Sequence, residues 1–124
     1  MTKKYGIVIV SHSADVAYGI HQLIQEVARD VAITHVGGTD DGKIGTSFEK
    51  VSTAFETNEA DHIYAFYDLG SAKMNIETIQ EISDKEIILF DVPILEGAYI
   101  TAAQLQMDES TQKINENLKT IIIK

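Results

Sequence analysis

The sequence contains no cysteine, and this absence excludes disulfide bonds, thiolate metal sites and cysteine nucleophiles. Basic residues are few, because ten Lys and Arg face nineteen Asp and Glu and leave a formal net charge of -9. The basic surface needed to bind nucleic acids or anionic membranes is therefore missing. Long apolar runs are missing too, and the N-terminal stretch MTKKYGIVIVSHS turns polar before a signal-peptide core is complete. We expect a cytoplasmic protein that binds neither nucleic acid nor membrane.

Tryptophan is also absent and proline occurs once, yet 44% of the 124 residues are apolar. This composition suits one compact domain, and a chain of this length buries about two-thirds of the surface that its unfolded form exposes. No internal repeat, linker or low-complexity segment interrupts the sequence. We therefore expect residues 1–124 to form a single domain.

Short apolar segments predict strands. The β-branched run at 5–10 is typical of a strand covered on both faces, as in a parallel sheet. Similar segments follow at 31–36, 62–67 and 86–90. The last segment, KTIIIK at 119–124, also favours a strand, and its lysines indicate an edge position.

Amphipathic segments between the strands predict helices. These segments lie at 14–30, from Thr46 or Ser47 to 56, from a cap at Ser71 onward, after Ile94, and at 108–117. The apolar face of the helix at 14–30 is made by Val16, Ile20, Leu23, Ile24 and Val27. The helix after Ser71 presents Met74, Ile76, Ile79 and Ile82. Strands alternating with helices indicate a doubly wound α/β fold with a mainly parallel sheet, helices on both faces and an antiparallel C-terminal edge strand.

Polar residues follow each predicted strand, and ligands bind at this edge of such sheets. His12 comes directly after the strand at 5–10 and just before a helix, whose free N–H groups favour an anion. A histidine at this position can also serve only as a hydrogen-bond partner within a turn. Asp68, which follows the third strand, can likewise serve only as a cap of the turn after it. If the two meet, Asp68 fixes the imidazole tautomer and leaves the other ring nitrogen free to act as a nucleophile. We assign His21, His35 and His62 to structure.

Several residues near His12 and Asp68 offer hydroxyl or backbone N–H groups to a phosphoryl group. They are Ser11, Ser13, Gly38, Thr39, Gly70 and Ser71. No G-x-S-x-G motif supports a serine hydrolase, and no P-loop or G-x-G-x-x-G motif supports a nucleotide or dinucleotide site. The pair Asp40-Asp41 lies in a glycine-rich loop, where acidic residues are usually solvated. We expect neither a metal ion nor a cofactor.

Four motifs together resemble a known family: IVIVSHS at 7–13, GTDDGKIGTS at 38–47, YDLGSAKMN at 67–75 and DVPILEGA at 91–98. The sequence is similar to the phosphotransferase subunit of the PEP-dependent dihydroxyacetone kinase, which is related to mannose-type IIA domains of the bacterial phosphotransferase system. The resemblance covers essentially the whole chain.

The resemblance implies a phosphotransferase whose His12 receives a phosphoryl group from the histidine carrier protein of the phosphotransferase system. His12 then passes the group to ADP on the nucleotide-binding subunit of the kinase. It also implies that Asp68 orients the imidazole, that Ser71 supplies a nearby hydroxyl, and that the chain is a homodimer with KTIIIK as a candidate contact. Because no carrier domain follows Lys124, we expect separate carriers.

Other functions stay open at this point. The same residues fit a IIA domain of a mannose-type sugar transporter, which has another acceptor. A non-enzymatic receiver-like regulatory module takes phosphate on an aspartate placed like Asp68, but it needs an acidic pair where this chain has Ser11-His12-Ser13. A flavodoxin-like carrier is a further alternative, because a hydroxyl-rich loop after the first strand can bind the flavin phosphate, but this chain has no tryptophan and no evident aromatic pair to hold the flavin ring. The sequence also leaves open which imidazole nitrogen reacts.

Overall fold

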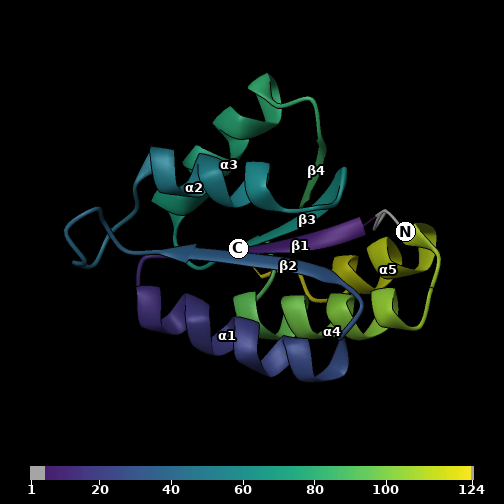
Figure 1. The fold of residues 1–124 in the computed structure, drawn as a ribbon. Helices are drawn as coiled ribbons and strands as arrows, with labels where there is room; N and C mark the ends of the chain where they lie inside the picture. The colour runs from purple at the N-terminus through teal and green to yellow at the C-terminus, as the bar shows by residue number, and fades with distance from the viewer. Residues whose placement is uncertain (1–4, 124) are drawn as a thin grey trace.

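A computed structural model of the chain describes residues 5–123, in which strands and helices alternate (Figure 1). The strands are β1 (Tyr5–Ser11), β2 (Ala32–Gly37), β3 (His62–Tyr67) and β4 (Glu86–Leu89). The helices are α1 (Ala14–Val27), α2 (Phe48–Thr57), α3 (Gly70–Ile82), α4 (Ile94–Gln106) and α5 (Thr111–Lys119). Every predicted element except the last strand is present, with boundaries moved by a few residues.

The strands form one sheet in the order β2-β1-β3-β4, and all three pairs are parallel. The chain moves from β1 outward to β2 and then returns to β3 on the other side of β1. Such a reversal of strand order is a topological switch point, where the carboxyl ends of the strands leave a crevice for ligands. The predicted α/β class is confirmed, and the switch point lies between the carboxyl ends of β1 and β3.

Helices cover both faces of the sheet: α1, α4 and α5 pack on one face, and α2 and α3 on the other (Figure 1). The central strand β1 is buried on both sides. Ile7 and Ile9 point into the core below α1 and α4, and Val8 and Val10 into the core below α2 and α3; all four are 0% exposed. This double burial is the physical reason for the continuous β-branched run at the start of the sequence.

The apolar faces of the helices are narrower than the sequence predicts. On α3, Ile76 and Ile79 are buried, but Met74 and Ile82 are each 67% exposed. Met74 lies roughly 200° around the helix from Ile76, and Ile82 is the last residue of the helix. Val16 and Leu23 on α1 are likewise exposed. Within residues 5–123, no helix is long and apolar enough to cross a membrane.

The predicted antiparallel C-terminal strand is wrong for the described residues. Lys119 ends α5, a turn follows, and residues 122 and 123 belong to no strand; Lys124 lies outside the described residues. Ile114 and Leu118 are fully buried and fix α5 on the core, so the helix continues up to Lys119. After the turn, the Ile123 N–H donates a hydrogen bond to the carbonyl of Asp91, which follows β4, at 3.1 Å.

Candidate active site

His12 and Asp68 meet at the carboxyl end of the sheet. Each is the first residue after its strand, and the last paired residues of β1 and β3 are Val10 and Tyr67. The Nδ1 atom of His12 lies 2.9 Å from Oδ1 of Asp68. The two side chains are only 13% and 22% exposed. The contact predicted across adjacent strand ends is therefore present.

The Asp68 carboxylate is held by hydrogen bonds from three residues. The Ser11 hydroxyl donates to Oδ2 at 2.6 Å, the His12 backbone N–H donates to Oδ2 at 3.0 Å, and the Leu69 N–H donates to Oδ1 at 2.7 Å. Burial alone raises the pKa of Asp68, but the hydrogen bonds from Ser11, His12 and Leu69 outweigh burial and bring this pKa below its usual value. Asp68 is therefore a carboxylate at neutral pH.

The Asp68 carboxylate determines the tautomer of His12. Because a carboxylate only accepts hydrogen bonds, the proton of the neutral imidazole is on Nδ1 and the lone pair is on Nε2. The hydroxyl of Ser71 forms a hydrogen bond with Nε2 and is therefore its donor. The imidazole thus presents one nucleophilic nitrogen toward α3.

The N-terminus of α3 lies beside this nitrogen, but not in the way the sequence predicts. The helix begins at Gly70, and its N-cap is Leu69, which makes no side-chain capping hydrogen bond. Ser71 is therefore not the cap; it lies in the first turn, and its hydroxyl bonds to His12. Leu69, Gly70 and Ser71 are exposed. The first N–H groups of a helix lack partners within the helix, so this turn can accept an anion.

The other predicted site residues make different contacts. Ser11 is fully buried, donates to Asp68 and accepts from the Ser13 N–H at 3.0 Å, so it supports Asp68 and does not face Nε2. Ser13 is the N-cap of α1 and accepts from the Val16 N–H. Within the described residues, the hydrogen bonds of Thr39 stay in the loop between β2 and α2 or reach Lys50, and none joins Gly38 to His12.

Sequence reasoning missed three residues that fasten this loop to the site. The Gly45 N–H donates to the His12 carbonyl at 2.8 Å. The Asn75 amide, on α3, donates to the Thr46 hydroxyl at 3.2 Å. The run DGKIG, with glycines at 42 and 45 that both adopt positive φ angles, was the only available signal of a tightly folded loop. Residues 38–47 therefore form one side of the site.

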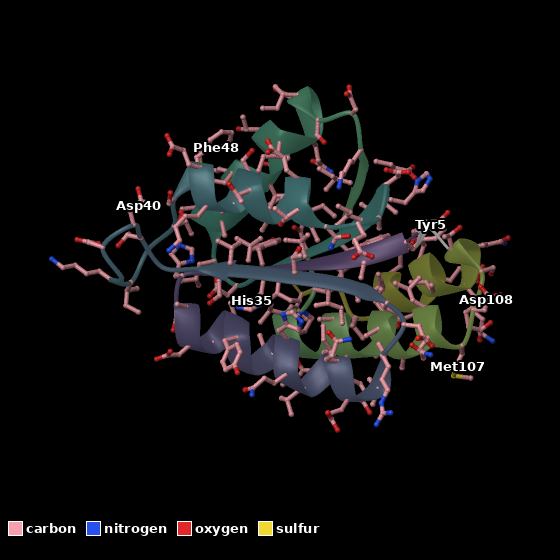
Figure 2. All side chains as sticks on the ribbon, in the orientation of Figure 1. Tyr5, His35, Asp40, Phe48, Met107 and Asp108 are labelled. Carbon is pink, nitrogen blue, oxygen red and sulfur yellow. The ribbon has the colours of Figure 1, made fainter. Side chains whose placement is uncertain are left out.

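Exposed apolar side chains lie on the segments that flank the site. Leu69, next to Asp68, is 58% exposed; Met74, about one helical turn after Ser71, is 67% exposed; and Ile44, next to Gly45, is 75% exposed. Phe48, at the start of α2, is 39% exposed and lies with Asp40 at the end of the molecule opposite Met107 and Asp108 (Figure 2). We call Ile44, Phe48, Leu69 and Met74 the apolar rim.

An ion pair follows the neighbouring strand end. Lys73 Nζ lies 2.9 Å from Oδ1 of Asp91, and the Tyr67 hydroxyl donates to the same carboxylate at 2.5 Å. The hydrogen bond to Asp91 raises the pKa of Lys73, and burial together with Asp91 raises the pKa of Tyr67. The cation of α3 nearest in sequence to Ser71 is therefore already paired with a carboxylate.

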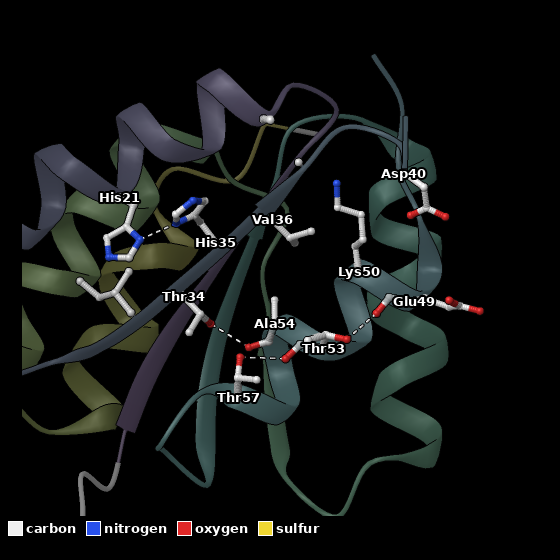
Figure 3. A pocket seen from close by; sticks show the side chains of 13 residues that line it. His21, Thr34, His35, Val36, Asp40, Glu49, Lys50, Thr53, Ala54 and Thr57 are labelled. Carbon is white, nitrogen blue, oxygen red and sulfur yellow. Dashed lines mark hydrogen bonds between the residues drawn. The ribbon is translucent and has the colours of Figure 1, made fainter. Parts of the chain in front are cut away.

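The other histidines lie away from the site. A groove of about 730 Å³ runs along the edge of β2 between α1 and α2, where His21 and His35 approach with their Nδ1 atoms 2.6 Å apart (Figure 3). Burial and the neighbouring His21 lower the pKa of His35. His62 pairs with Glu86 at 2.5 Å. No group of three or more His, Asp or Glu in residues 5–123 could hold a metal ion.

Comparison with known proteins gives consistent matches over nearly the whole chain. The family described as "PTS system fructose IIA component" (EIIA-man) matches residues 6–115. The phosphoryl donor subunit DhaM of PEP-dependent dihydroxyacetone kinase 1 from Listeria innocua is 68% identical over 100% of both chains. The phosphotransferase subunit DhaM of the PTS-dependent dihydroxyacetone kinase from Lactococcus lactis is 48% identical over 96% of this chain and 97% of that relative.

Solved structures agree on the fold. A crystal structure of the protein of unknown function EF1359 has a TM-score of 0.83 at 27% identity and covers 98% of this chain and 97% of its own. A sigma-54 interaction domain protein from Enterococcus faecalis has a TM-score of 0.72 at 11% identity, covers 97% of this chain and 91% of its own, and bears on the fold alone.

Proposed function

Because the chain belongs to the EIIA-man family of phosphotransferase-system IIA components, we propose that it carries a phosphoryl group on His12 as the phosphoryl donor subunit of a dihydroxyacetone kinase. It accepts the group from the histidine carrier protein and gives it to ADP held on the nucleotide-binding subunit. The names of the relatives at 68% and 48% identity support the kinase assignment. The observation that carries the proposal is the His12 imidazole, held by Asp68 with its Nε2 lone pair directed outward.

The chemistry requires no proton transfer. The Nε2 lone pair attacks the phosphorus of the donor phosphohistidine, and the donor nitrogen leaves with its electron pair. The His12 ring then carries a phosphoryl group on Nε2 and keeps its proton on Nδ1, so it becomes cationic and is stabilised by the Asp68 carboxylate 2.9 Å away. When an oxygen of ADP attacks the phosphorus, the neutral ring is restored in its original tautomer.

The groups around Nε2 suit a transient phosphoryl group. The first-turn N–H groups of α3 can receive its oxygens, and the Ser71 hydroxyl can donate to one of them once Nε2 is occupied. Lys73 is neutralised by Asp91, so no unpaired cation of α3 holds the dianion. A weakly held phosphoryl group can leave as readily as it arrives, as a carrier requires.

The apolar rim supports docking of another protein. Ile44, Leu69 and Met74 are each more than half exposed and lie around His12, as expected of a surface that partners cover during transfer. The shallow site accepts the carrier protein and the kinase subunit in turn.

We propose further that the chain works in the cytoplasm as a homodimer. The contact would be formed by the exposed side chains of Ile122 and Ile123, next to Asp91. Sedimentation of an Ile122→Lys, Ile123→Lys variant tests this contact.

Transfer from the phosphorylated chain tests the choice of acceptor. The purified phospho-form is mixed either with the nucleotide-binding kinase subunit loaded with ADP or with the IIB domain of a mannose-type transporter. Rapid loss of the phosphoryl group with formation of ATP in the first mixture supports the kinase role. Loss only in the second mixture would assign the chain to sugar transport, which the family description also allows.

A further inference from the structure

The outer face of α1 and α4 carries an apolar groove that shares no residue with the apolar rim. The two helices pack side by side on one face of the sheet (Figure 1). A groove of about 350 Å³ lies between them and is lined by Leu23 on α1 and by Leu95, Glu96, Tyr99 and Ile100 on α4. Leu23 is 56% exposed and Tyr99 is 46% exposed. The groove is therefore an apolar surface open to solvent.

A hollow on α1 extends this surface. Gly19 lies in the interior of α1, about one turn before Leu23, and Val16 lies about one turn before Gly19. Glycine makes a helix less stable than alanine does. Nothing lies within 4 Å of a Cβ atom added at Gly19, so packing inside this chain does not require a glycine there. The missing side chain leaves room for another molecule to approach the backbone of α1.

The charges on this face are all negative. Neither α1 nor α4 contains Lys or Arg, whereas α2, α3 and α5 each contain Lys. Asp15 and Glu26 lie about three turns apart on the same side of α1, next to the stripe of Val16 and Leu23. Asp15, Glu26 and Glu96 are exposed, and none of the ion pairs found within residues 5–123 involves them. The face therefore combines an apolar groove with unneutralised carboxylates.

A basic amphipathic helix fits such a face. Its apolar side chains, three and four residues apart, fill the groove, and its Lys and Arg side chains lie against the carboxylates. A second copy of this chain fits poorly, because its own α1 and α4 would bring the same carboxylates together. We propose that the face of α1 and α4 docks a basic amphipathic helix of a protein that exchanges the phosphoryl group with His12. This inference rests on the proposed function.

The face begins at the edge of the sheet where His12 lies. α1 starts at Ala14, two residues after His12, and α4 starts at Ile94, after β4. Both helices therefore begin at the carboxyl edge of the parallel sheet. A partner held along the groove is kept beside this edge, so its phosphoryl-exchanging group has a high effective concentration near His12.

Glu96→Lys tests the charge of the face. Phosphorylation by the phosphorylated histidine carrier protein and transfer to the ADP-loaded kinase subunit are measured at partner concentrations far below saturation. We expect at least one of the two rates to fall roughly tenfold at low salt, and the loss to shrink at high salt. Glu81→Lys, an exposed position in the last turn of α3, changes the net charge equally and should leave the rates unchanged. An equal loss in Glu81→Lys would overturn the proposal.

Gly19→Gln tests the hollow. Because glutamine forms helices more readily than glycine, the urea midpoint of this variant should not fall. The rate that is sensitive to Glu96→Lys should nevertheless fall about tenfold, since the new side chain fills the space of the partner helix. Thr78→Gln, exposed on α3, is the matched control and should leave the rate unchanged.

Two results of these measurements would overturn the docking proposal. The first is that both protein partners exchange the phosphoryl group at natural rates with Gly19→Gln and with Glu96→Lys. The second is that Gly19→Gln abolishes self-association in sedimentation, which would assign the face to a second copy of this chain.

The small donor phosphoramidate separates docking from the proposed function. All variants should accept its phosphoryl group as the natural chain does, because no protein docks in this reaction. A loss with phosphoramidate confined to Gly19→Gln and Glu96→Lys would place the defect in His12 and overturn the docking. Unchanged variants beside an active natural chain would overturn the docking alone. A natural chain that gains no phosphoryl group from phosphoramidate or from the carrier protein would overturn the proposed function as well.

Discussion

At His12, the decisive property is the identity of the ring nitrogen that holds the proton. The Asp68 carboxylate, fixed by Ser11 and by the N–H groups of His12 and Leu69, keeps that proton on Nδ1. The nitrogen that keeps its lone pair, and that we propose reacts, is therefore Nε2. Sequence alone left this choice open, because the spacing of His12 and Asp68 along the chain says nothing about which atoms meet.

Replacement of Asp68 by asparagine should slow phosphorylation of His12 strongly. The amide removes the charge that stabilises the cationic phosphorylated ring, and it can hold the ring in the wrong tautomer. We expect a loss of roughly 10²- to 10⁴-fold in rate, the range seen when the orienting carboxylate of a catalytic histidine is removed. Rapid-quench measurement of phosphate uptake checks this. Asp61→Asn, an exposed carboxylate just before β3, is the control; an equal loss there would contradict the role of Asp68.

The lowered pKa of Asp68 also predicts how stability depends on pH. A carboxyl group whose pKa is lower in the folded than in the unfolded chain stabilises the fold at pH values above its unfolded pKa. This contribution disappears as the pH falls through the folded pKa. We expect the natural chain to exceed Asp68→Asn in unfolding free energy at pH 6, and the difference to shrink below about pH 4. Urea unfolding across this range measures it, and a difference that grows on acidification would contradict the assignment.

At the scale of elements, the loop at 38–47 depends on one glycine. Gly45 has a φ of 144°, and a Cβ atom added there would lie 2.7 Å from Cγ2 of Thr39. Gly45→Ala should therefore cost about 1–3 kcal/mol and weaken the hydrogen bond to the His12 carbonyl. Gly19→Ala in α1 is the matched control, because nothing lies within 4 Å of its added Cβ. That control should gain about 0.5–1 kcal/mol in urea unfolding, and equal effects at both positions would contradict this account.

The sequence predicted the elements well wherever one local pattern dominated. The run IVIV reported double burial because every one of its side chains lies in a core, and Ser47 caps α2 as expected. The prediction of a strand at KTIIIK failed, because burial of Ile114 and Leu118 extends the preceding helix to Lys119. The sequence also predicted Ser71 as the helix cap, whereas Leu69 is the cap. A serine near a helix start looks the same in the sequence whether its hydroxyl bonds to the helix backbone or to His12. Contacts between distant segments, such as Asn75 with Thr46, have no local signature.

At the scale of the whole molecule, a carrier must present one surface to two proteins. The net charge of -9 favours basic partners, and we propose the apolar rim as the dry contact that they cover. The groove along β2 lies on the edge of the sheet between α1 and α2 and contains neither His12 nor Asp68. The groove is therefore not part of the site at which we propose that the phosphoryl group is exchanged.

Met74 and Ile82 provide a matched test of the rim. Both lie on α3 and both are 67% exposed, but only Met74 is about one turn from Ser71. Met74→Lys should lower the rate of phosphorylation by the histidine carrier protein about tenfold or more, the loss expected when an interface anchor is removed. Ile82→Lys should leave it unchanged. Phosphorylation of both variants by the small donor phosphoramidate should match that of the natural chain; a loss there would place the defect in His12 and not in docking.

The central claim is that His12 carries the phosphoryl group, and intact mass tests it most directly. The natural chain and His12→Ala are incubated briefly with PEP, enzyme I and the histidine carrier protein, then measured without exposure to acid. The account predicts a gain of one acid-labile phosphoryl group in the natural chain and none in His12→Ala. Equal gain in both proteins would move the phosphate to another residue, with Asp68 the first to be examined, and no gain in either would contradict the carrier function itself.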